Sequence, residues 1–348
     1  MNFINNIEIK NFKSIRHQKI EGCKKINVFI GYPNVGKSNI LEALSLLSYS
    51  TNFGFTPLND ICRYEKLIEL FYNGDKQNNI EIAIDQNTFL LKLLDSNTLD
   101  YCWTFNQHEN ATSNLDIFKD LIRRNIRIKT NGEIDLLNSK DISTLEYDVK
   151  KYLFKQIAFN HKENPDVLNM PYGNNLFEVI RYNTKLQNEV GELLTDYNLN
   201  LHFDADVNLK VLKKLNKYFT FEIPFIQIAE TIQRLLFHKA AIFSSDNSVL
   251  IFEEPEAHMF PPYIKKLTTD IILDKTNQFF LSTHSPYVLD ELILDVGEDL
   301  AVYIVDYKEG ETIIHNLSND DLSEIRQYGV DLFFNIESYL KHGQVNHS

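Results

Sequence analysis

The sequence has few cysteines and no long apolar run, and both absences narrow the class of protein. Its three cysteines, Cys23, Cys62 and Cys102, lie far apart and provide neither a disulfide framework nor the spacing of a metal site. We therefore interpret them as small buried apolar residues. No stretch of about eighteen apolar residues is present, and the first residues lack the basic and apolar segments of a signal peptide. These absences predict a cytoplasmic protein without a membrane span.

An excess of positive charge is also lacking. Acidic residues outnumber basic ones by 48 to 35, which gives a formal charge of −13. The overall field therefore does not attract nucleic acid, and DNA binding would require a local basic patch. Two clusters are candidates, although a solvated helix face explains each of them equally well. They are Lys119, Arg123, Arg124, Arg127 and Lys129, and Lys210, Lys213, Lys214 and Lys217.

Residues 31–38 carry the clearest functional signal. Their sequence, GYPNVGKS, fits the pattern G-x-x-x-x-G-K-[S/T], and it lies between an apolar run at 26–30 and a helix-like run at 39–47. The strand and helix in these positions argue against a chance match. Loop N–H groups and the positive end of a following helix favour phosphate. The residues predicted to bind ATP here are Gly31, Tyr32, Pro33, Asn34, Val35, Gly36, Lys37, Ser38 and Asn39.

The pattern of apolar residues divides the chain into three parts. Residues 1–111 contain the phosphate loop and alternating segments at 66–72, 80–84 and 88–93 that predict an antiparallel meander. Residues 112–225 are predicted to form a helical lobe, with helical spacing at 116–128, 142–159 and 175–194. Residues 226–348 return to interleaved helices and strands, which predict a parallel core sheet.

Polar side chains follow two of the predicted strands in the last part. Glu253 and Glu254 come directly after the apolar run 248–252, and His284 follows the run 278–282. Ligands of parallel sheets bind at the carboxyl ends of the strands, so these groups should lie beside the phosphate loop. Glu253 would hold Mg²⁺, Glu254 would orient or deprotonate water, and His284 would donate to the γ-phosphate. For Glu256 and His258 a surface turn is favoured over a metal site.

Together, these motifs resemble those of ABC-type ATPases of the RecF, SMC and OLD kind. The motifs are Asn-Phe-Lys-Ser at 11–14, the phosphate loop, LIFEEPEAH at 250–258 and LSTHSP at 281–286. The resemblance implies an α/β ATPase head, with a P-loop parallel core sheet, an antiparallel meander and a helical insertion. It makes Gly31 to Ser38 the Walker A motif, with Lys37 acting in catalysis and Lys13 contacting nucleotide. Ser38 and Glu253 become metal ligands, Glu254 the catalytic glutamate and His284 the switch histidine.

Two departures from the family pattern concern hydrolysis. Such ATPases place two ATP molecules between two heads, and a Ser-x-Gly-x-Gln signature of one head caps the other's γ-phosphate. Here that slot reads Ala229-Glu230-Thr231-Ile232-Gln233, without the serine hydroxyl or the glycine. The usual Q-loop glutamine is missing, and Arg63 is the nearest polar candidate. A slow or partner-stimulated ATPase is therefore expected.

The form of the chain indicates a biological role by analogy. About sixty residues follow Pro286, too few for an additional Toprim nuclease domain, and no sustained heptads appear between 112 and 220. Compact heads of this kind resemble ATPase subunits of bacterial anti-phage defence, which act with a separate nuclease or toxin effector. A RecF-like ATPase that binds DNA, and a non-hydrolysing ATP-dependent assembly protein, are the alternatives.

Overall fold

A six-stranded sheet lies at the centre of the molecule. The computed structural model describes residues 3–51, 56–96, 98–105, 122–129, 134–139, 147–157, 165–203 and 209–345. The strand order is β16-β15-β3-β14-β13-β9, and all neighbours are parallel except β15 and β16. The strands are β3 (Ile26–Ile30), β9 (Asp148–Tyr152), β13 (Ser248–Glu253), β14 (Gln278–Ser282), β15 (Leu300–Lys308) and β16 (Glu311–Asn316). This is the predicted parallel core.

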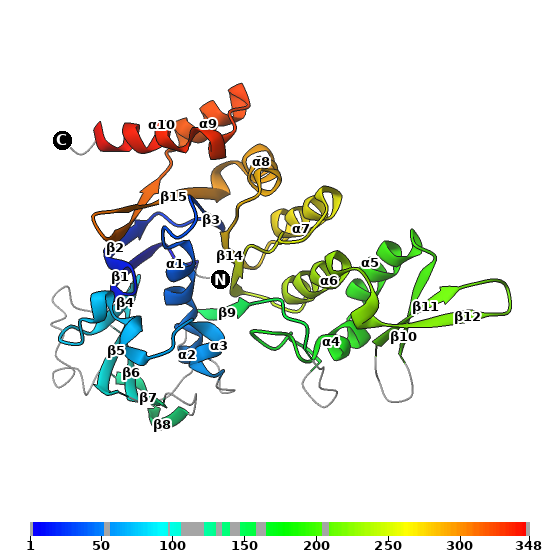
Figure 1. Ribbon diagram of the computed structural model, residues 1–348, viewed down its shortest axis with the longest axis horizontal. Helices are drawn as coiled ribbons and strands as arrows, with labels where there is room; N and C mark the ends of the chain where they lie inside the picture. The colour runs from blue at the N-terminus through cyan, green and yellow to red at the C-terminus, as the bar shows by residue number, and fades with distance from the viewer. Residues whose placement is uncertain are drawn as a thin grey trace.

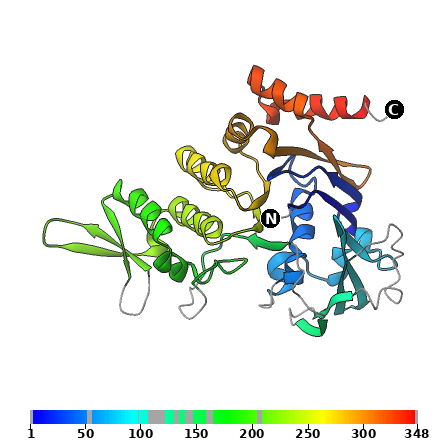
Figure 2. The same cartoon turned by 180° about the vertical axis from the view of Figure 1, so that it is seen from behind.

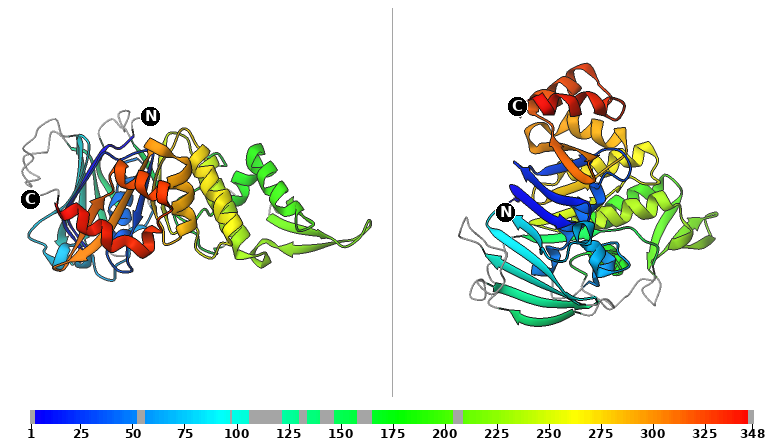
Figure 3. Two further views of the ribbon diagram at one scale, coloured as in Figure 1. Left: turned by 90° about the horizontal axis from the view of Figure 1, so that it is seen from above. Right: turned by 60° about the vertical axis from the view of Figure 1, so that its left-hand side comes forward.

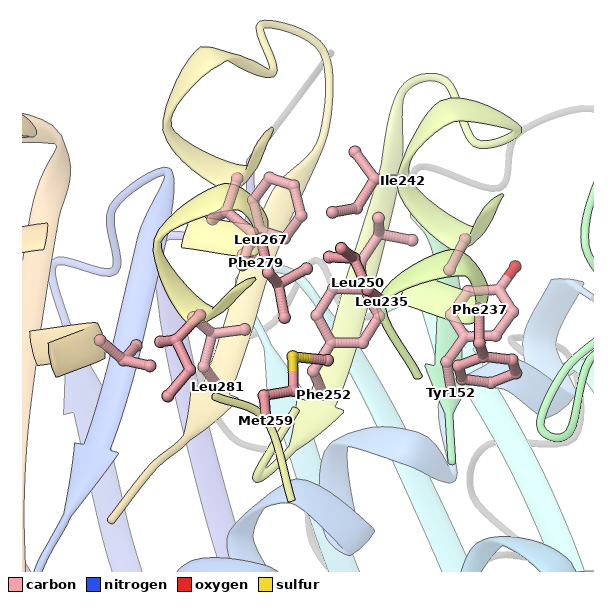
Figure 4. Close-up of a cluster of buried hydrophobic side chains, with 14 of the residues drawn as sticks. Tyr152, Leu235, Phe237, Ile242, Leu250, Phe252, Met259, Leu267, Phe279 and Leu281 are labelled. Atoms are coloured by element: carbon pink, nitrogen blue, oxygen red, sulfur yellow. The ribbon is translucent and has the colours of Figure 1, made fainter. Parts of the chain in front are cut away.

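Both faces of this sheet are covered, which explains its unbroken apolar strands. All five residues of β3 and all five of β14 are buried. Alternate side chains enter two different cores: Val28 packs with one hydrophobic cluster and Phe29 with the other. Figure 4 shows part of the first cluster, where Phe252 and Phe279 of the sheet lie beside Leu235 and Leu267 of the covering helices. A parallel sheet buried on both faces needs such continuous apolar strands.

A seven-stranded antiparallel sheet forms the second layer. Its order is β2-β1-β4-β5-β6-β7-β8. The strands are β1 (Asn6–Phe12), β2 (Ile15–Glu21), β4 (Ile80–Ile84), β5 (Asn87–Asp95), β6 (Thr98–Phe105), β7 (Ile122–Lys129) and β8 (Ile134–Ser139). Helix α1 (Lys37–Ser45) packs between the two sheets, because its buried side chains share a cluster with both. The short helices α2 (Ser48–Thr51), α3 (Leu58–Ile61), η1 (Leu67–Leu70) and η2 (Tyr72–Gly74) follow it.

Several predicted elements differ from those observed. Residues 66–72 form 3₁₀ turns instead of a strand. The helix predicted at 116–128 is wrong, since β7 occupies 122–129 and extends the meander; residues 116–121 lie outside the described part. The helix predicted at 142–159 is wrong as well, because β9 joins the core sheet. The third, at 175–194, is two helices, α4 (Leu176–Tyr182) and α5 (Thr184–Thr195).

The lobe therefore mixes helices with a small sheet. Helices α4 and α5 lead into a three-stranded antiparallel sheet of β10 (Leu199–Phe203), β11 (Leu209–Lys214) and β12 (Thr220–Pro224). Figure 1 and the left view of Figure 3 show the β11–β12 hairpin projecting to the end of the molecule farthest from the meander. The turn η3 (Phe225–Gln227) then returns the chain to the head.

Helices from the last third cover the core sheet on the face opposite α1. Helices α6 (Glu230–Phe243), α7 (Pro261–Leu273) and α8 (Pro286–Asp295) contribute to the first cluster. The turn η4 (Gly297–Asp299) precedes β15, and helices α9 (Asn319–Tyr328) and α10 (Leu332–Val345) close the chain beside α8 (Figure 2). In the described residues, no helix is both long enough and apolar enough to span a bilayer.

Candidate functional site

The loop between β3 and α1 has the backbone shape of a phosphate-binding loop. Gly31 and Gly36 adopt φ values of 147° and 107°, which side-chain-bearing residues rarely adopt. A Cβ atom on Gly31 would overlap the carbonyl oxygen of Val305, and one on Gly36 would overlap the hydroxyl of Thr312. Glycine is thus required at both positions by backbone angle and by space. Helix α1 begins at Lys37 directly after the second glycine.

Thr312 braces this loop from the far end of the sequence. Its hydroxyl donates to the Val35 carbonyl at 2.8 Å and lies 2.6 Å from the Ser14 hydroxyl. Asn39 donates to the same Ser14 oxygen at 2.7 Å. The loop is therefore held between the β1–β2 turn and β16. Sequence reasoning missed Thr312 because no local pattern links residues so far apart in the chain.

Lys37 is buried inside the loop. Its ammonium group donates to the carbonyl oxygens of Gly31 at 2.9 Å and Tyr32 at 2.8 Å. Burial lowers the pKa of Lys37, while Glu254 and Glu253 oppose that shift. Both carbonyls are neutral acceptors, so an anion at the loop would offer this charge a stronger partner.

The strand-end carboxylates and His284 lie next to the loop, as the parallel-sheet argument predicted. Glu254 adopts a left-handed φ of 45°, and its N–H donates to the Ser282 carbonyl at 3.0 Å. This geometry brings its carboxylate within 3.3 Å of His284 Nε2. Burial and the nearby Lys37 lower the pKa of His284, whereas Glu254 raises it. The imidazole is therefore mainly neutral at pH 7.

Glu256 corrects the prediction of a surface turn. Only 7% of the residue is exposed, and its Oε1 accepts from the Thr283 hydroxyl at 2.5 Å and from the His284 N–H at 3.1 Å. Burial raises the pKa of Glu256. His258 is exposed, as a turn requires. Glu256 thus fixes the backbone that carries His284, a role that its spacing from His258 did not indicate.

Arg63 and Lys13 reach the same region through a buried glutamate. Glu42 of α1 pairs with Lys13 and accepts from Arg63 Nε at 2.8 Å. The other end of the guanidinium donates to Glu253 at 3.0 Å. Arg63 is the polar residue nearest in sequence to the position where the Q-loop glutamine is expected. It therefore contacts Glu253, the predicted metal ligand. Glu42 was not predicted, since a glutamate within a helical run looks like a solvated position.

These groups line one pocket of about 480 Å³. Its walls hold ten of the predicted site residues together with Arg63. They are Lys13, Pro33, Asn34, Gly36, Lys37, Ser38, Asn39, Arg63, Glu253, Glu254 and His284. Gly31, Tyr32 and Val35 belong to the same loop but not to the pocket lining. The structure thus brings the sequence-predicted residues together from four segments of the chain, and Arg63 adds a fifth. Their roles remain predictions.

The signature slot lies elsewhere on the molecule. Ala229 precedes α6, where Glu230 pairs with Arg234 at 2.7 Å. Thr231 donates to the His258 carbonyl at 2.8 Å, and the amide of Gln233 donates to the Ile228 carbonyl at 2.8 Å. Within the described residues, none of this segment lines the phosphate-loop pocket. A capping role would therefore have to be exerted on a second copy.

The two basic clusters are far apart and partly neutralised. Arg127 donates to Asp100 at 3.0 Å and Lys129 lies 3.3 Å from Asp135 on the meander. The described part of the chain does not include Lys119 or the side chains of Arg123 and Arg124. It does not include the side chain of Cys102 either. The second cluster lies on the lobe, at the opposite end of Figure 1. The two clusters therefore do not form a single basic groove.

Comparison with known families decides the classification. The family model for "AAA domain, putative AbiEii toxin, Type IV TA system" matches residues 81–290, more than half of the chain. The chain belongs to this AAA-domain family.

Two of the three cysteines agree with the interpretation made from the sequence. Cys23 and Cys62 are both buried, and neither forms a disulfide.

Relatives of this AAA-domain chain include DNA repair proteins. It is 33% identical over 91 residues to "DNA replication and repair protein RecF" of Thermoanaerobacter sp., covering 24% of this chain and 25% of that protein. It is 36% identical over 97 residues to an "ATP/GTP phosphatase" of Helicobacter pylori, covering 25% and 26%. A RecF of Francisella tularensis is 28% identical over 241 residues, covering 59% and 62%. The first relatives are thus matched over about a quarter of their length.

Solved structures confirm the fold. A Smc head bound to the C-winged helix domain of ScpA has a TM-score of 0.52 at 14% identity, covering 93% of this chain and all of that one. A Pyrococcus furiosus Smc head with an extended coiled coil gives the same TM-score at 13% identity, covering 94% and 99%. The AAA-domain chain thus has the fold of an ABC-type ATPase of the RecF and SMC group, as its motifs predicted.

Proposed function

We propose that this protein binds ATP with Mg²⁺ and hydrolyses it as the ATPase subunit of a bacterial anti-phage defence system. The observation that carries the first part is the pocket in which Lys37, Ser38, Glu253, Glu254 and His284 converge. Each supplies a group that phosphoryl transfer to water requires: a phosphate-binding cation, a hydroxyl and a carboxylate for metal, a base, and a hydrogen-bond donor.

The pocket fits a nucleotide with a divalent cation. The loop of residues 31–38 and the start of α1 present N–H groups, and Lys37 adds positive charge beneath them. Ser38 and Glu253 line the same wall, and Mg²⁺ at phosphate sites is commonly held by one or two side chains plus the phosphates. When bound, Mg²⁺ neutralises phosphate charge and holds the phosphates in place.

Glu254 and His284 would act on the two reacting groups, the attacking water and the γ-phosphate. Glu254 projects from the end of β13 and would orient or deprotonate the attacking water. His284, whose Nε2 lies 3.3 Å from the Glu254 carboxylate, would donate to the γ-phosphate. Glu256 is buried and accepts from the His284 N–H, so the backbone that carries the proposed donor is held by a buried group.

The position of the signature slot supports the proposal that the protein self-associates. Ala229 and Thr231 lie outside the chain's own pocket, so two copies would have to meet to place this segment on nucleotide. The missing hydroxyl and glycine favour slow or partner-stimulated hydrolysis. A non-hydrolysing assembly protein that uses ATP only to associate is the alternative that this departure supports.

The defence role rests on family membership. The family description names an AbiEii toxin and a type IV toxin–antitoxin system. We infer that ATP binding here drives association and controls a separately encoded nuclease or toxin. This inference is an analogy between relatives, because a fold alone does not determine a function.

Purification from the native host tests this role. With ATP and Mg²⁺, the wild-type protein should form a multimer that contains a nuclease- or toxin-like subunit encoded by a neighbouring gene. The Lys37→Ala variant should not, because the charge beneath the phosphates is lost. Native mass spectrometry measures mass and composition together. A protein that stays monomeric with and without nucleotide, and that carries no second subunit, would contradict the defence proposal.

A RecF-like activity on DNA is the second candidate, and the tip of the lobe favours it. The β11–β12 hairpin exposes 82% of Tyr218, 66% of Phe219 and 57% of Phe221. Lys213, Lys214 and Lys217 are exposed beside them, and no acidic residue occurs between 213 and 221. Exposed aromatics for base stacking beside lysines for phosphates are the usual means of holding a single strand.

Charge reversal at this tip separates the two candidates. Under the DNA hypothesis, changing Lys213, Lys214 and Lys217 to Glu should weaken binding of a single-stranded oligonucleotide by at least about tenfold and reduce its salt dependence. Fluorescence anisotropy at several salt concentrations measures both. The same change at three exposed lysines of the head is the control: Lys19, Lys24 and Lys76. Equal losses in both triple variants, or no binding by the wild type, would eliminate the lobe as a DNA site.

A further inference from the structure

Arg63 joins two carboxylates that belong to different layers of the head. Its Nε donates at 2.8 Å to Glu42, a residue of α1 that is 1% exposed. Its terminal nitrogen donates at 3.0 Å to Glu253 at the end of β13. A guanidinium can serve both because its donors form a rigid planar fork, which an ammonium group lacks.

The backbone below this side chain is firmly held. Lys13 donates to the Arg63 carbonyl at 2.7 Å, and Lys151 donates to the Ile61 carbonyl at 2.9 Å. The Arg63 N–H also points to Glu42, at 3.4 Å. In contrast, the Arg63 side chain itself is 67% exposed and lines the phosphate-loop pocket. The guanidinium can therefore rearrange at its tip while the segment that carries it stays in place.

Glu253 has little other compensation for its charge. Its side chain is 15% exposed, and besides Arg63 its ion-pair partner among the described residues is Lys151, whose ammonium lies 3.9 Å from Oε2, while Lys37 acts on it electrostatically from farther away. That lysine is already engaged with the Ile61 carbonyl. A carboxylate removed from water is costly unless it is paired. Among the described residues, Arg63 is thus the main neutralising partner of Glu253.

We propose that Arg63 and a divalent cation are mutually exclusive partners of Glu253, so that metal binding displaces the guanidinium tip into the pocket. This inference rests on the proposed function, because it takes Glu253 as a metal residue. Two positive charges that share one small carboxylate repel each other strongly in a partly buried site. Anchored through Nε to Glu42, the displaced tip would face the space assigned to phosphates, where guanidinium binds well.

The consequence is coupling between metal and nucleotide. When metal binds without nucleotide, it displaces the Arg63 guanidinium from Glu253, and the guanidinium gains no new partner. Metal should therefore bind weakly in the absence of nucleotide. Phosphates give the displaced guanidinium a partner, and the two ligands should therefore favour each other. Removal of the Arg63 guanidinium should raise the affinity for metal and lower the affinity for nucleotide. A purely structural role would not change the two affinities in opposite directions.

The test measures each ligand separately in wild type and in Arg63→Gln. Mn²⁺ binding to nucleotide-free protein, followed by electron paramagnetic resonance, should become about tenfold tighter in the variant because the competing charge is gone. Binding of a fluorescent ATP analogue without metal should become several-fold weaker because a phosphate partner is lost. Weaker or unchanged Mn²⁺ binding in the variant would overturn the proposal.

Three further variants complete the design. Arg16→Gln removes an exposed arginine of β2 and should change neither affinity. Adding Glu253→Gln to Arg63→Gln should abolish the gain in Mn²⁺ affinity, which locates the gain at this carboxylate. If Arg63→Gln does not fold, Arg63→Lys serves, since one ammonium cannot pair with both carboxylates and Mn²⁺ should again bind more tightly. Failure of wild type to bind the ATP analogue would refute the proposed function, while the Mn²⁺ comparison would still decide on Arg63.

Discussion

Replacing Lys37 by alanine is expected to lower the affinity for ATP by at least about a hundredfold. Each hydrogen bond to a charged partner contributes about 1.5–3 kcal/mol, and this ammonium would reach two phosphates. Among the described residues, its hydrogen-bond acceptors are the Gly31 and Tyr32 carbonyls, which are neutral. Its strongest interactions should therefore appear only with phosphate present. Fluorescence titration with an ATP analogue measures the loss directly.

Lys25 provides a matched control for this substitution. It is less buried than Lys37, but it likewise donates to two backbone carbonyls, those of Ile272 and Asp274, and burial lowers its pKa as well. It does not line the phosphate-loop pocket. Lys25→Ala should affect stability about as much as Lys37→Ala and leave nucleotide affinity unchanged. Equal nucleotide affinity in wild type and Lys37→Ala would contradict the assignment of this loop as the ATP site.

The convergence of the predicted residues on one pocket could be predicted because their signals are local. Gly31 and Gly36 are imposed by backbone angles within one loop, and that pattern is readable in eight residues. Glu253 and His284 each follow a buried apolar run, and parallel strands bring their carboxyl ends to one edge. Neither inference needed knowledge of which strands are neighbours.

The bracing residues could not be predicted because their partners are distant in sequence. Thr312 meets Val35, and Glu42 meets Arg63, through the packing of separate layers. Glu256 follows a proline and precedes an exposed histidine, which is typical of a turn, yet its carboxylate is buried under the His284 backbone. Only tertiary structure distinguishes such a glutamate from a solvated one.

The misassigned strands show a second limit. In β7, Ile126 and Ile128 are buried with a period of two, but Ile122 and Ile126 are also four residues apart, as on a helix. In β9, two lysines lie in a strand that pairs with β13 inside the core sheet. Lys151 is buried there because it donates to the Ile61 carbonyl. Tertiary pairing decided both elements against their local pattern.

The second large effect is expected for Glu254→Gln, which should slow ATP turnover by at least about a hundredfold while ATP binding persists. An amide cannot accept a proton from water, although glutamine has nearly the same shape as the glutamate whose carboxylate lies 3.3 Å from His284 Nε2. Phosphate release measures turnover, and titration with the ATP analogue measures binding. ATP-bound protein should then accumulate in its associated form, detectable by light scattering, because the step that ends the ATP state is blocked.

Glu309→Gln is the control, because Glu309 also adopts a left-handed φ, 51° against 45° for Glu254, on the β15–β16 turn outside the pocket. Backbone strain at a glutamate is therefore the same in both variants, and only the position differs. If Glu254→Gln loses turnover and Glu309→Gln does not, the loss is due to the missing carboxylate in the pocket and not to backbone strain. Unchanged turnover in Glu254→Gln would remove the general base and favour the assembly alternative, since nucleotide-dependent association needs the phosphate loop but not this carboxylate. The same pair of variants thus tests whether ATP is consumed or only bound.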